Sequence, residues 1–201
     1  MTGGVQPPLG DVATRREAVV VAALSIVGES GLEALSARSL AKHCGVSTMA
    51  IYSLFGGMPG LYEALAARAT DLMNTYILDA NSGLPPLDRL RGFGLAYRRF
   101  ALEHPAAFEL LTRRGHSLVV AMRDRPSYAA YLAAIEQGKA EGLFRPELDA
   151  REFGDILWAA AHGMLTFELS GTYPAGEDHE ARLMRGFDLL LAAGMPVEQR
   201  K

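Results

Sequence analysis

Apolar residues recur at intervals of three and four positions along most of the chain, which is the spacing of one face of an α-helix. The first such segment follows Thr14 and Glu17, whose spacing is typical of a helix N-terminus, and it stops at Gly31. Its apolar face consists of Val19, Ala22, Ala23, Ile26 and Val27. No segment shows the sustained alternation of apolar and polar residues that a half-buried strand requires. We therefore predict an all-α fold.

Further helices are predicted where this spacing lies between capping residues and Gly or Pro stops. Two short helices fall between residues 36 and 55, and a long helix follows and ends before Asn81-Ser82-Gly83. The remaining helices are expected to begin after Pro85-Pro86, at His104-Pro105, at Ser127, at Asp149 and shortly before Leu183. Residues 1–12 contain several Gly and Pro residues, and we expect them to form a flexible arm.

Composition narrows the class of protein. The chain has 201 residues, of which 49% are hydrophobic and 21% charged, with a net charge of −3. These values exclude a mainly disordered or collagen-like chain. The single cysteine, Cys44, excludes an internal disulfide and a multi-cysteine metal site. The longest nearly apolar stretch, residues 18–27, is shorter than the about 20 residues of a membrane-spanning helix. We expect a soluble cytoplasmic protein without membrane association, metal or cofactor.

The two short helices between residues 36 and 55 meet at a tight turn. Gly45 stops the first helix, and Ser47 is placed to cap the second, whose apolar residues Ile51, Leu54 and Phe55 face inward. Such a pair is a helix-turn-helix, which places its second helix in the major groove of DNA. The residues expected to contact DNA lie at the helix starts or on the outward face: Ser36, Arg38, Ser47, Thr48, Met49, Ala50, Tyr52 and Ser53.

The chemistry of these outward residues suits DNA contact better than an ordinary solvated surface, which is the alternative. Thr48 and Met49 offer a hydroxyl and an apolar surface to base edges and thymine methyl groups. Tyr52, one turn later, can donate its hydroxyl to a phosphate. Residues 1–81 carry five basic side chains against seven acidic ones. Few phosphates can therefore be neutralised, and we expect only a modest salt dependence of binding.

Several short motifs of this region are similar to a known family. They are Gly31-Leu32-Glu33-Ala34-Leu35, Leu40-Ala41, Gly45-Val46-Ser47, Ile51-Tyr52 and Phe55-Gly56. Over roughly residues 14 to 65 the chain closely resembles the DNA-binding domain of TetR-type transcriptional regulators. The resemblance implies a homodimer on a near-palindromic operator, an effector pocket in the C-terminal helices, and repression as the usual mode. The chain departs from the family at Met58, where many relatives carry a lysine that contacts a phosphate.

This resemblance divides the chain into four parts. Residues 1–12 form the arm, residues 13–58 the DNA-binding domain, residues 59–81 a connecting helix, and residues 82–201 a domain for effector binding and dimerisation. A second resemblance is carried by Trp158-Ala159-Ala160-Ala161-His162-Gly163 and by Phe100-Ala101-Leu102-Glu103-His104-Pro105. These segments look like parts of the C-terminal ligand-binding module called the WHG domain, over much of residues 85–192.

Side chains from several C-terminal helices are candidates for an effector pocket, although each also suits an ordinary core position. The candidates are Tyr97, Phe100, Phe108, Met122, Tyr131, Trp158 and His162. Trp158 and His162 lie one turn apart, and this histidine has no metal-spaced partner, so a packed core is the main alternative. A pocket of this composition would bind a small, largely apolar molecule.

Two C-terminal helices carry more apolar surface than one core-facing stripe requires. The segment from Asp155 to Ala161 is apolar nearly all round the helix, and the final helix is similarly rich in apolar residues. Pairing both helices with their two-fold copies would form a four-helix dimer interface. The residues predicted to form it are Trp158, Leu183, Phe187, Leu190 and Leu191.

Enzymatic motifs are missing from the sequence. It contains no Gly-rich phosphate loop, no Gly-x-Ser-x-Gly elbow and no His-Glu-x-x-His pair, and its carboxylates are dispersed. We therefore expect no catalytic residues. The alternative to a DNA-binding regulator is a helical small-molecule carrier or interaction module in which the helix pair is incidental. A mobility-shift assay would separate the two.

Overall fold

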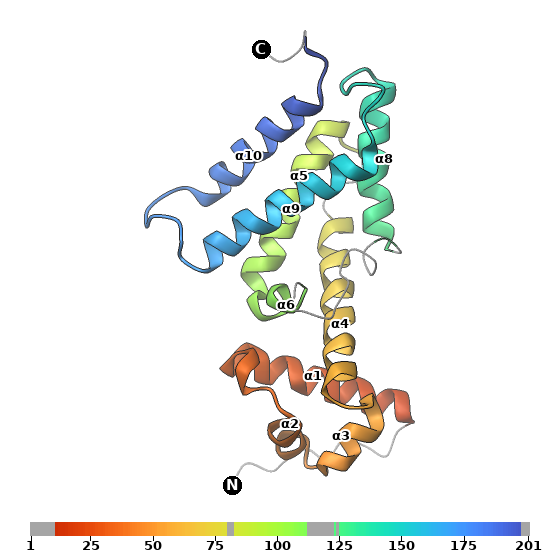
Figure 1. Ribbon diagram of the computed structural model, residues 1–201, viewed down its shortest axis with the longest axis vertical. Coiled ribbons are helices and arrows are strands. Elements are labelled where there is room, and N and C mark those ends of the chain that lie inside the picture. Colours follow the sequence, from red (N-terminus) through yellow and green to blue (C-terminus); the bar gives the residue numbers. More distant parts are fainter. Residues whose placement is uncertain (1–10, 80–82, 112–122, 124, 198–201) are drawn as a thin grey trace. The chain divides into compact units, whose positions relative to one another are not determined.

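Helices make up the regular structure (Figure 1). The computed structural model describes residues 11–79, 83–111, 123 and 125–197, and these ranges contain no strand. The predicted all-α fold is confirmed, while residues 1–10 of the predicted arm lie outside the described residues. The helices are α1 (Val12–Ser30), the 3-10 turn η1 (Leu32–Ala34), α2 (Ala37–Cys44), α3 (Thr48–Phe55), α4 (Met58–Asp79), α5 (Pro86–Glu103), α6 (Pro105–Leu110), α8 (Pro126–Ala140), α9 (Ala150–Leu169) and α10 (His179–Gly194). In the described ranges, no helix has the length and apolar character needed to cross a membrane.

Helix α1 begins earlier than predicted. The carboxylate of Asp11 accepts a hydrogen bond of 3.3 Å from the N–H of Ala13, and the helix starts at Val12. The prediction that Thr14 caps this helix is therefore wrong, because Asp11 already satisfies an unpaired N–H and its negative charge suits a helix N-terminus. Residues 11 and 12 belong to the helix and its cap, not to the arm.

The helix-turn-helix forms from local capping signals, as predicted. The Ser36 hydroxyl accepts from the Ser39 N–H at 3.0 Å, and the Ser39 hydroxyl accepts from the Ser36 N–H at 2.9 Å. Gly45 ends α2 in the left-handed conformation, with a φ of 66°. Ser47 then caps α3 by accepting from the Ala50 N–H at 3.2 Å. The short α2 and α3 are thus held at both ends of their tight turn.

The described chain divides into two units. The first, which we call the head, contains residues 11–71 and 104–111. Its core includes Leu40, Ile51 and Leu65, and it is completed by Leu110 from α6, which packs against α1. The boundaries expected from the sequence, at residues 58 and 81, differ from this division. The first turns of α4 and the distant α6 join the head by long-range packing, which local patterns do not reveal.

The second unit, the C-terminal unit, contains the described residues among 72–103 and 120–201. Within it, α5 packs against α8, α9 and α10, and α9 also packs against α8 and α10 (Figure 1). Phe144 and Leu157 lie in its core. Arg98 on α5 forms ion pairs with Glu168 on α9, at 2.7 Å, and with Glu180 on α10, at 2.9 Å. This arginine therefore ties three helices together.

Candidate DNA-binding and ligand-binding sites

One face of α3 is left to solvent by the packing of its other face. Ile51 and Phe55 are buried in the head core, whereas the side chain of Met49 is 74% exposed and that of Tyr52 is 49% exposed. Thr48, beside Met49 in the first turn, is exposed as well. The outward side of α3 thus presents a hydroxyl, a thioether and a phenol, and no charge. These groups can hydrogen-bond or make apolar contacts with base edges.

The other residues predicted to contact DNA lie around this helix pair. Arg38 and Ser53 are exposed, and Ala50 is half-buried. Ser36 and Ser47 are exposed but use their hydroxyls to cap α2 and α3. At these two positions the N–H groups of a helix N-terminus, which favour anions, are the groups available to a phosphate.

Arg16 supports the far end of α3, a role that the sequence analysis missed. Its guanidinium donates a hydrogen bond of 3.1 Å to the carbonyl oxygen of Leu54 and lies 4.7 Å from the centre of the Phe55 ring. A cation suits a helix C-terminus and the face of an aromatic ring. These groups lie far apart in the sequence and meet only because α1 packs against α3. No local sequence pattern therefore indicates the role of Arg16.

The positive charge available to DNA is small. Arg16 is engaged with α3, and Arg68 lies 3.6 Å from Glu17. Arg38 and Lys42 are exposed and form no ion pair among the described residues. The structure thereby agrees with the weakly charged head expected from the sequence.

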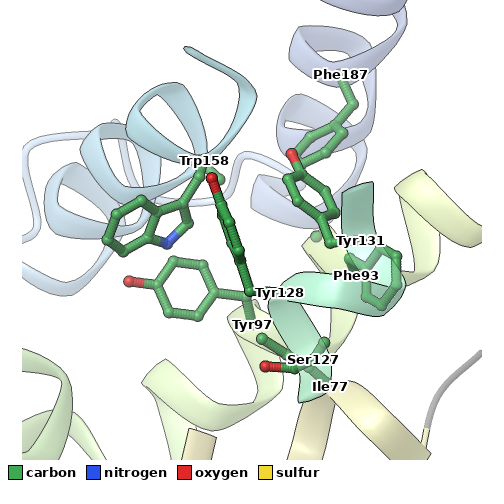
Figure 2. A pocket seen from close by; sticks show the side chains of 10 residues that line it. Ile77, Phe93, Tyr97, Ser127, Tyr128, Tyr131, Trp158 and Phe187 are labelled. Atoms are coloured by element: carbon green, nitrogen blue, oxygen red, sulfur yellow. The ribbon is translucent and has the colours of Figure 1, made fainter. Parts of the chain in front are cut away.

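The C-terminal unit contains a cavity of about 50 Å³, walled mainly by aromatic rings (Figure 2). Its lining residues are Ile77, Phe93, Gly94, Tyr97, Ser127, Tyr128, Tyr131, Trp158, Ala161 and Phe187. They come from α4, α5, α8, α9 and α10. Not one of these residues carries a charged side chain. The cavity therefore suits an apolar, uncharged molecule.

The structure brings together three of the seven candidate pocket residues in this wall. Tyr97, Tyr131 and Trp158 line the cavity. Phe100 stands behind the wall, with its ring stacked on that of Tyr97 at 6.3 Å between centres. His162 likewise contacts Tyr97 rather than the cavity.

Two candidates are placed elsewhere. Phe108 is buried on α6, which belongs to the head, so it is not part of this cavity. Met122 lies outside the described residues. Ser127 and Tyr128 were missed, because the sequence marks them only as the start of a helix. Nothing local indicates which side chains of α8 turn toward α4 and α9.

Polar atoms behind the cavity wall are paired with one another. The Tyr97 hydroxyl forms a hydrogen bond of 2.7 Å with Nδ1 of His162 and accepts another from the side chain of Trp158. Burial raises the pKa of Tyr97 far above its usual value and lowers the pKa of His162. Both side chains are therefore uncharged near neutral pH, and the wall stays free of charge.

The lowered pKa of His162 predicts a pH-dependent stability. As the pH falls through about 6.5, the usual value for histidine, the unfolded chain takes up a proton that the folded chain resists. The contribution of His162 is thus fully present above this pH and is lost below it. We expect His162→Gln to reduce the loss of stability between pH 7 and pH 5, measured by denaturant unfolding at each pH. An unchanged slope would contradict this account, and His43→Gln, at an exposed position, serves as the control.

Three of the five predicted dimer-interface residues are not available for an interface. Leu183, Phe187 and Leu191 are buried in the core of their own chain. Trp158 and Leu190 are half-buried. The structure packs these three residues into the core of their own chain. Helix α10 is apolar on two sides, and the sequence does not show which side faces inward.

A metal centre receives no support: no group of three or more potential metal ligands occurs in the part of the chain that the structure describes.

Two family models match the chain. Residues 19–65 match the model described as bacterial regulatory proteins of the tetR family, and residues 90–190 match that of the tetracyclin repressor-like C-terminal domain. The first range contains the whole helix-turn-helix, and the second contains most of the cavity wall. The matching C-terminal model is not described as a WHG domain, so that finer resemblance stays a prediction.

Relatives of similar length agree with these matches. The HTH-type transcriptional repressor KstR2 of Mycobacterium tuberculosis is 27% identical over 165 residues, covering 75% of this chain and 82% of that protein. An uncharacterized HTH-type transcriptional regulator of the same species, Rv0681, is 26% identical over 183 residues, covering 90% and 81%. A solved structure from Rhodococcus sp. RHA1 shares the fold, with a TM-score of 0.72 at 24% identity, covering 95% of this chain and 100% of that one.

Proposed function

Because the chain belongs to the TetR family of bacterial transcriptional regulators, we propose that it represses transcription as a homodimer on a near-palindromic operator and is released by a small, largely apolar molecule. The outward face of α3 carries the DNA-binding part of the proposal, since Met49 and Tyr52 are exposed beside a buried face that fixes the helix. Repression is supported by the relative KstR2, which is named a repressor.

Reading of the DNA sequence is assigned to the first turn of α3. Thr48 and Met49 would contact base edges, while Tyr52 would donate its hydroxyl to a phosphate. The capped N-termini of α2 and α3, at Ser36 and Ser47, would receive further phosphates. Most of these contacts are uncharged, so the affinity depends on hydrogen bonds and shape more than on counterion release.

The dimer interface is placed on the exposed apolar side of α9 and α10, instead of the buried side. Ile156 and Phe167 on α9 and Leu189 on α10 are exposed. Ala159 and Gly163 lie between the first two at the spacing of one helix face. Since α9 and α10 pack against each other within the chain, two copies related by a two-fold axis would form a four-helix interface.

We propose that α4 couples effector binding to release of the protein from its operator, because this helix contributes residues to both cores. Leu61 and Leu65 at its start lie in the head core, and Ile77 near its end lines the cavity. A molecule that moves Ile77 would shift α4 and change the spacing of two heads that must match about one turn of DNA. A coupling of about 1–3 kcal/mol would lower operator affinity roughly 5- to 150-fold.

Selection of binders from random duplexes tests the DNA-binding part. We expect one enriched near-palindromic motif. Met49→Ala should relax the preference at one base pair of each half-site, by about 1 kcal/mol of discrimination. Tyr52→Phe should lower the affinity for all DNA sequences alike. The expected loss is about 10-fold for a dimer, because the change removes one phosphate hydrogen bond from each of its two heads.

The matched control is Tyr173→Phe, which removes a phenol hydroxyl from the C-terminal unit and should leave DNA affinity unchanged. Failure to enrich any motif at low salt would overturn the proposal and favour a helical carrier. Equal effects of the Tyr52 and Tyr173 variants would overturn the role given to Tyr52.

A further inference from the structure

The described residues include two buried polar side chains outside ion pairs, and they differ in one respect. Thr70 and Ser127 are at most 1% exposed. The Thr70 hydroxyl donates to the carbonyl oxygen of Ala66 at 2.8 Å. The Ser127 hydroxyl has no hydrogen-bond partner among the described residues, and it lies in the cavity wall. An unpaired buried hydroxyl is costly, so its place in a cavity points to a missing partner.

The position of Ser127 is itself well fixed. Its backbone N–H donates to Oδ1 of Asn74 at 3.1 Å, which joins the start of α8 to α4. Ser127 stands at the second position of α8, after Pro126. Ser127 and Ile77 both line the cavity, and Figure 2 draws them below Trp158 in this view. The backbone of Ser127 is therefore fixed, while its hydroxyl forms no hydrogen bond with the described residues.

The tyrosine hydroxyls of the cavity wall already form hydrogen bonds with other groups of the protein. The hydroxyl of Tyr128 donates to Asp155 and that of Tyr131 to the carbonyl oxygen of Gly154, both at 3.2 Å. The Tyr97 hydroxyl is paired with His162. Among the described lining residues, Ser127 thus provides the one side-chain hydroxyl that has no hydrogen-bond partner.

We propose that this cavity binds an uncharged molecule of about one ring, which carries a single hydroxyl or carbonyl oxygen that hydrogen-bonds to Oγ of Ser127. The inference rests on the proposed effector role of the C-terminal unit and gives that effector a chemical class. A charged ligand is disfavoured because the wall offers it no counter-charge, and burial of an unpaired ion is very costly.

The size of the cavity limits the ligand. Its volume of about 50 Å³ is below the roughly 150 Å³ of an apolar cavity that holds benzene. A single ring therefore enters only if a wall side chain moves, and each further fused ring would require a larger displacement of the wall. Trp158 is half-buried, lines the cavity and is the single tryptophan of the chain. Its fluorescence consequently reports directly on binding.

Three six-membered-ring probes test the proposal on the full-length protein without DNA. Cyclohexanol has the hydroxyl, methylcyclohexane lacks it, and cyclohexanecarboxylate carries a charge. Titrations are followed by Trp158 emission and by calorimetry. We expect cyclohexanol and methylcyclohexane to bind and the carboxylate not to bind. Ser127→Ala should lower the affinity for cyclohexanol about 10-fold and leave the affinity for methylcyclohexane unchanged, because only the alcohol loses a hydrogen bond. Ser127→Cys, which nearly keeps the side-chain volume, should act in the same direction.

Thr70→Val is the matched control, since it removes a buried but satisfied hydroxyl from the head. It should lower the melting temperature and leave cyclohexanol affinity unchanged, whereas Ser127→Ala should not lower the melting temperature. The proposal is overturned if cyclohexanol does not bind, or if the Ser127 variants lower the affinities for cyclohexanol and methylcyclohexane equally. Operator binding is measured separately. A protein that binds its operator but not cyclohexanol would contradict this inference alone, and one that binds cyclohexanol without change in operator affinity would contradict only the proposed release.

Discussion

Replacement of Gly60 by alanine is expected to abolish operator binding while the C-terminal unit stays folded. A Cβ atom at Gly60 would lie far inside van der Waals contact with the carbonyl oxygen of Phe55 and 3.1 Å from its carbonyl carbon. The obstacle is backbone, so no side-chain rotation relieves it. Either the end of α3 or the start of α4 must shift, which would also disturb the contact of Arg16 with Leu54 and Phe55. We expect a cost of about 3 kcal/mol to the head and a loss of operator affinity beyond about 100-fold.

For Gly60→Ala, the folding of the two units is followed by two different signals. Trp158 reports on the C-terminal unit, so its emission should remain native while hydrogen exchange shows an opened head. Gly28→Ala is the matched control, because a Cβ there meets nothing within 4 Å. Gly28 lies inside α1 of the same unit, and alanine should stabilise that helix by about 0.5–1 kcal/mol. A Gly60→Ala protein with native operator affinity would show that this close approach is not needed.

Leu189→Glu is expected to split the dimer and to remove most operator affinity. The Leu189 side chain is 74% exposed on α10, and it belongs to the surface that we assign to the interface. A carboxylate buried there, and duplicated by the two-fold axis, would face its own copy without a partner charge. Each half-site alone binds weakly, so the loss of linkage between two heads should cost about 100-fold or more.

Light scattering at micromolar concentration and operator titration measure these two effects together. Leu95→Glu is the control, since Leu95 is a 37% exposed leucine on α5, outside the proposed interface. Its variant should remain a dimer and bind DNA normally. A dimeric Leu189→Glu protein would place the interface elsewhere. Phe187→Glu makes the contrast clear: this side chain is buried, so the change should unfold the C-terminal unit rather than separate intact monomers.

The features that the sequence predicted correctly are those set by neighbouring residues. Ser36, Ser47 and Asp149 cap their helices as expected, because each needs only a side-chain oxygen within reach of an N–H two or three positions later. The error at α1 has the same origin. Asp11 and Thr14 are both good caps, and the spacing rule does not rank them.

The site was only partly predictable because it depends on which faces meet. The sequence named Tyr97 and Trp158 as candidates from their apolar character and helical spacing, and both line the cavity. It could not identify Ser127, since the lack of a partner is a property of the folded surroundings. It also could not show which face of α10 packs inward, because Phe187 and Leu189 are both apolar and differ in what packs against them.

The contribution of Leu110 to the head core has a consequence for the synthesis of the protein. The ribosome delivers α1 to α4 first, but the core of this unit stays incomplete until α5 and α6 have also emerged. The nascent chain must therefore hold a partly exposed apolar surface on α1 while the end of α4 and α5, which belong to the C-terminal unit, are being made. Such surfaces favour misassembly during this period. An excised N-terminal fragment would carry the same gap permanently. The head is in this sense a discontinuous unit, and its boundaries are set by long-range packing as well as by the order of the sequence.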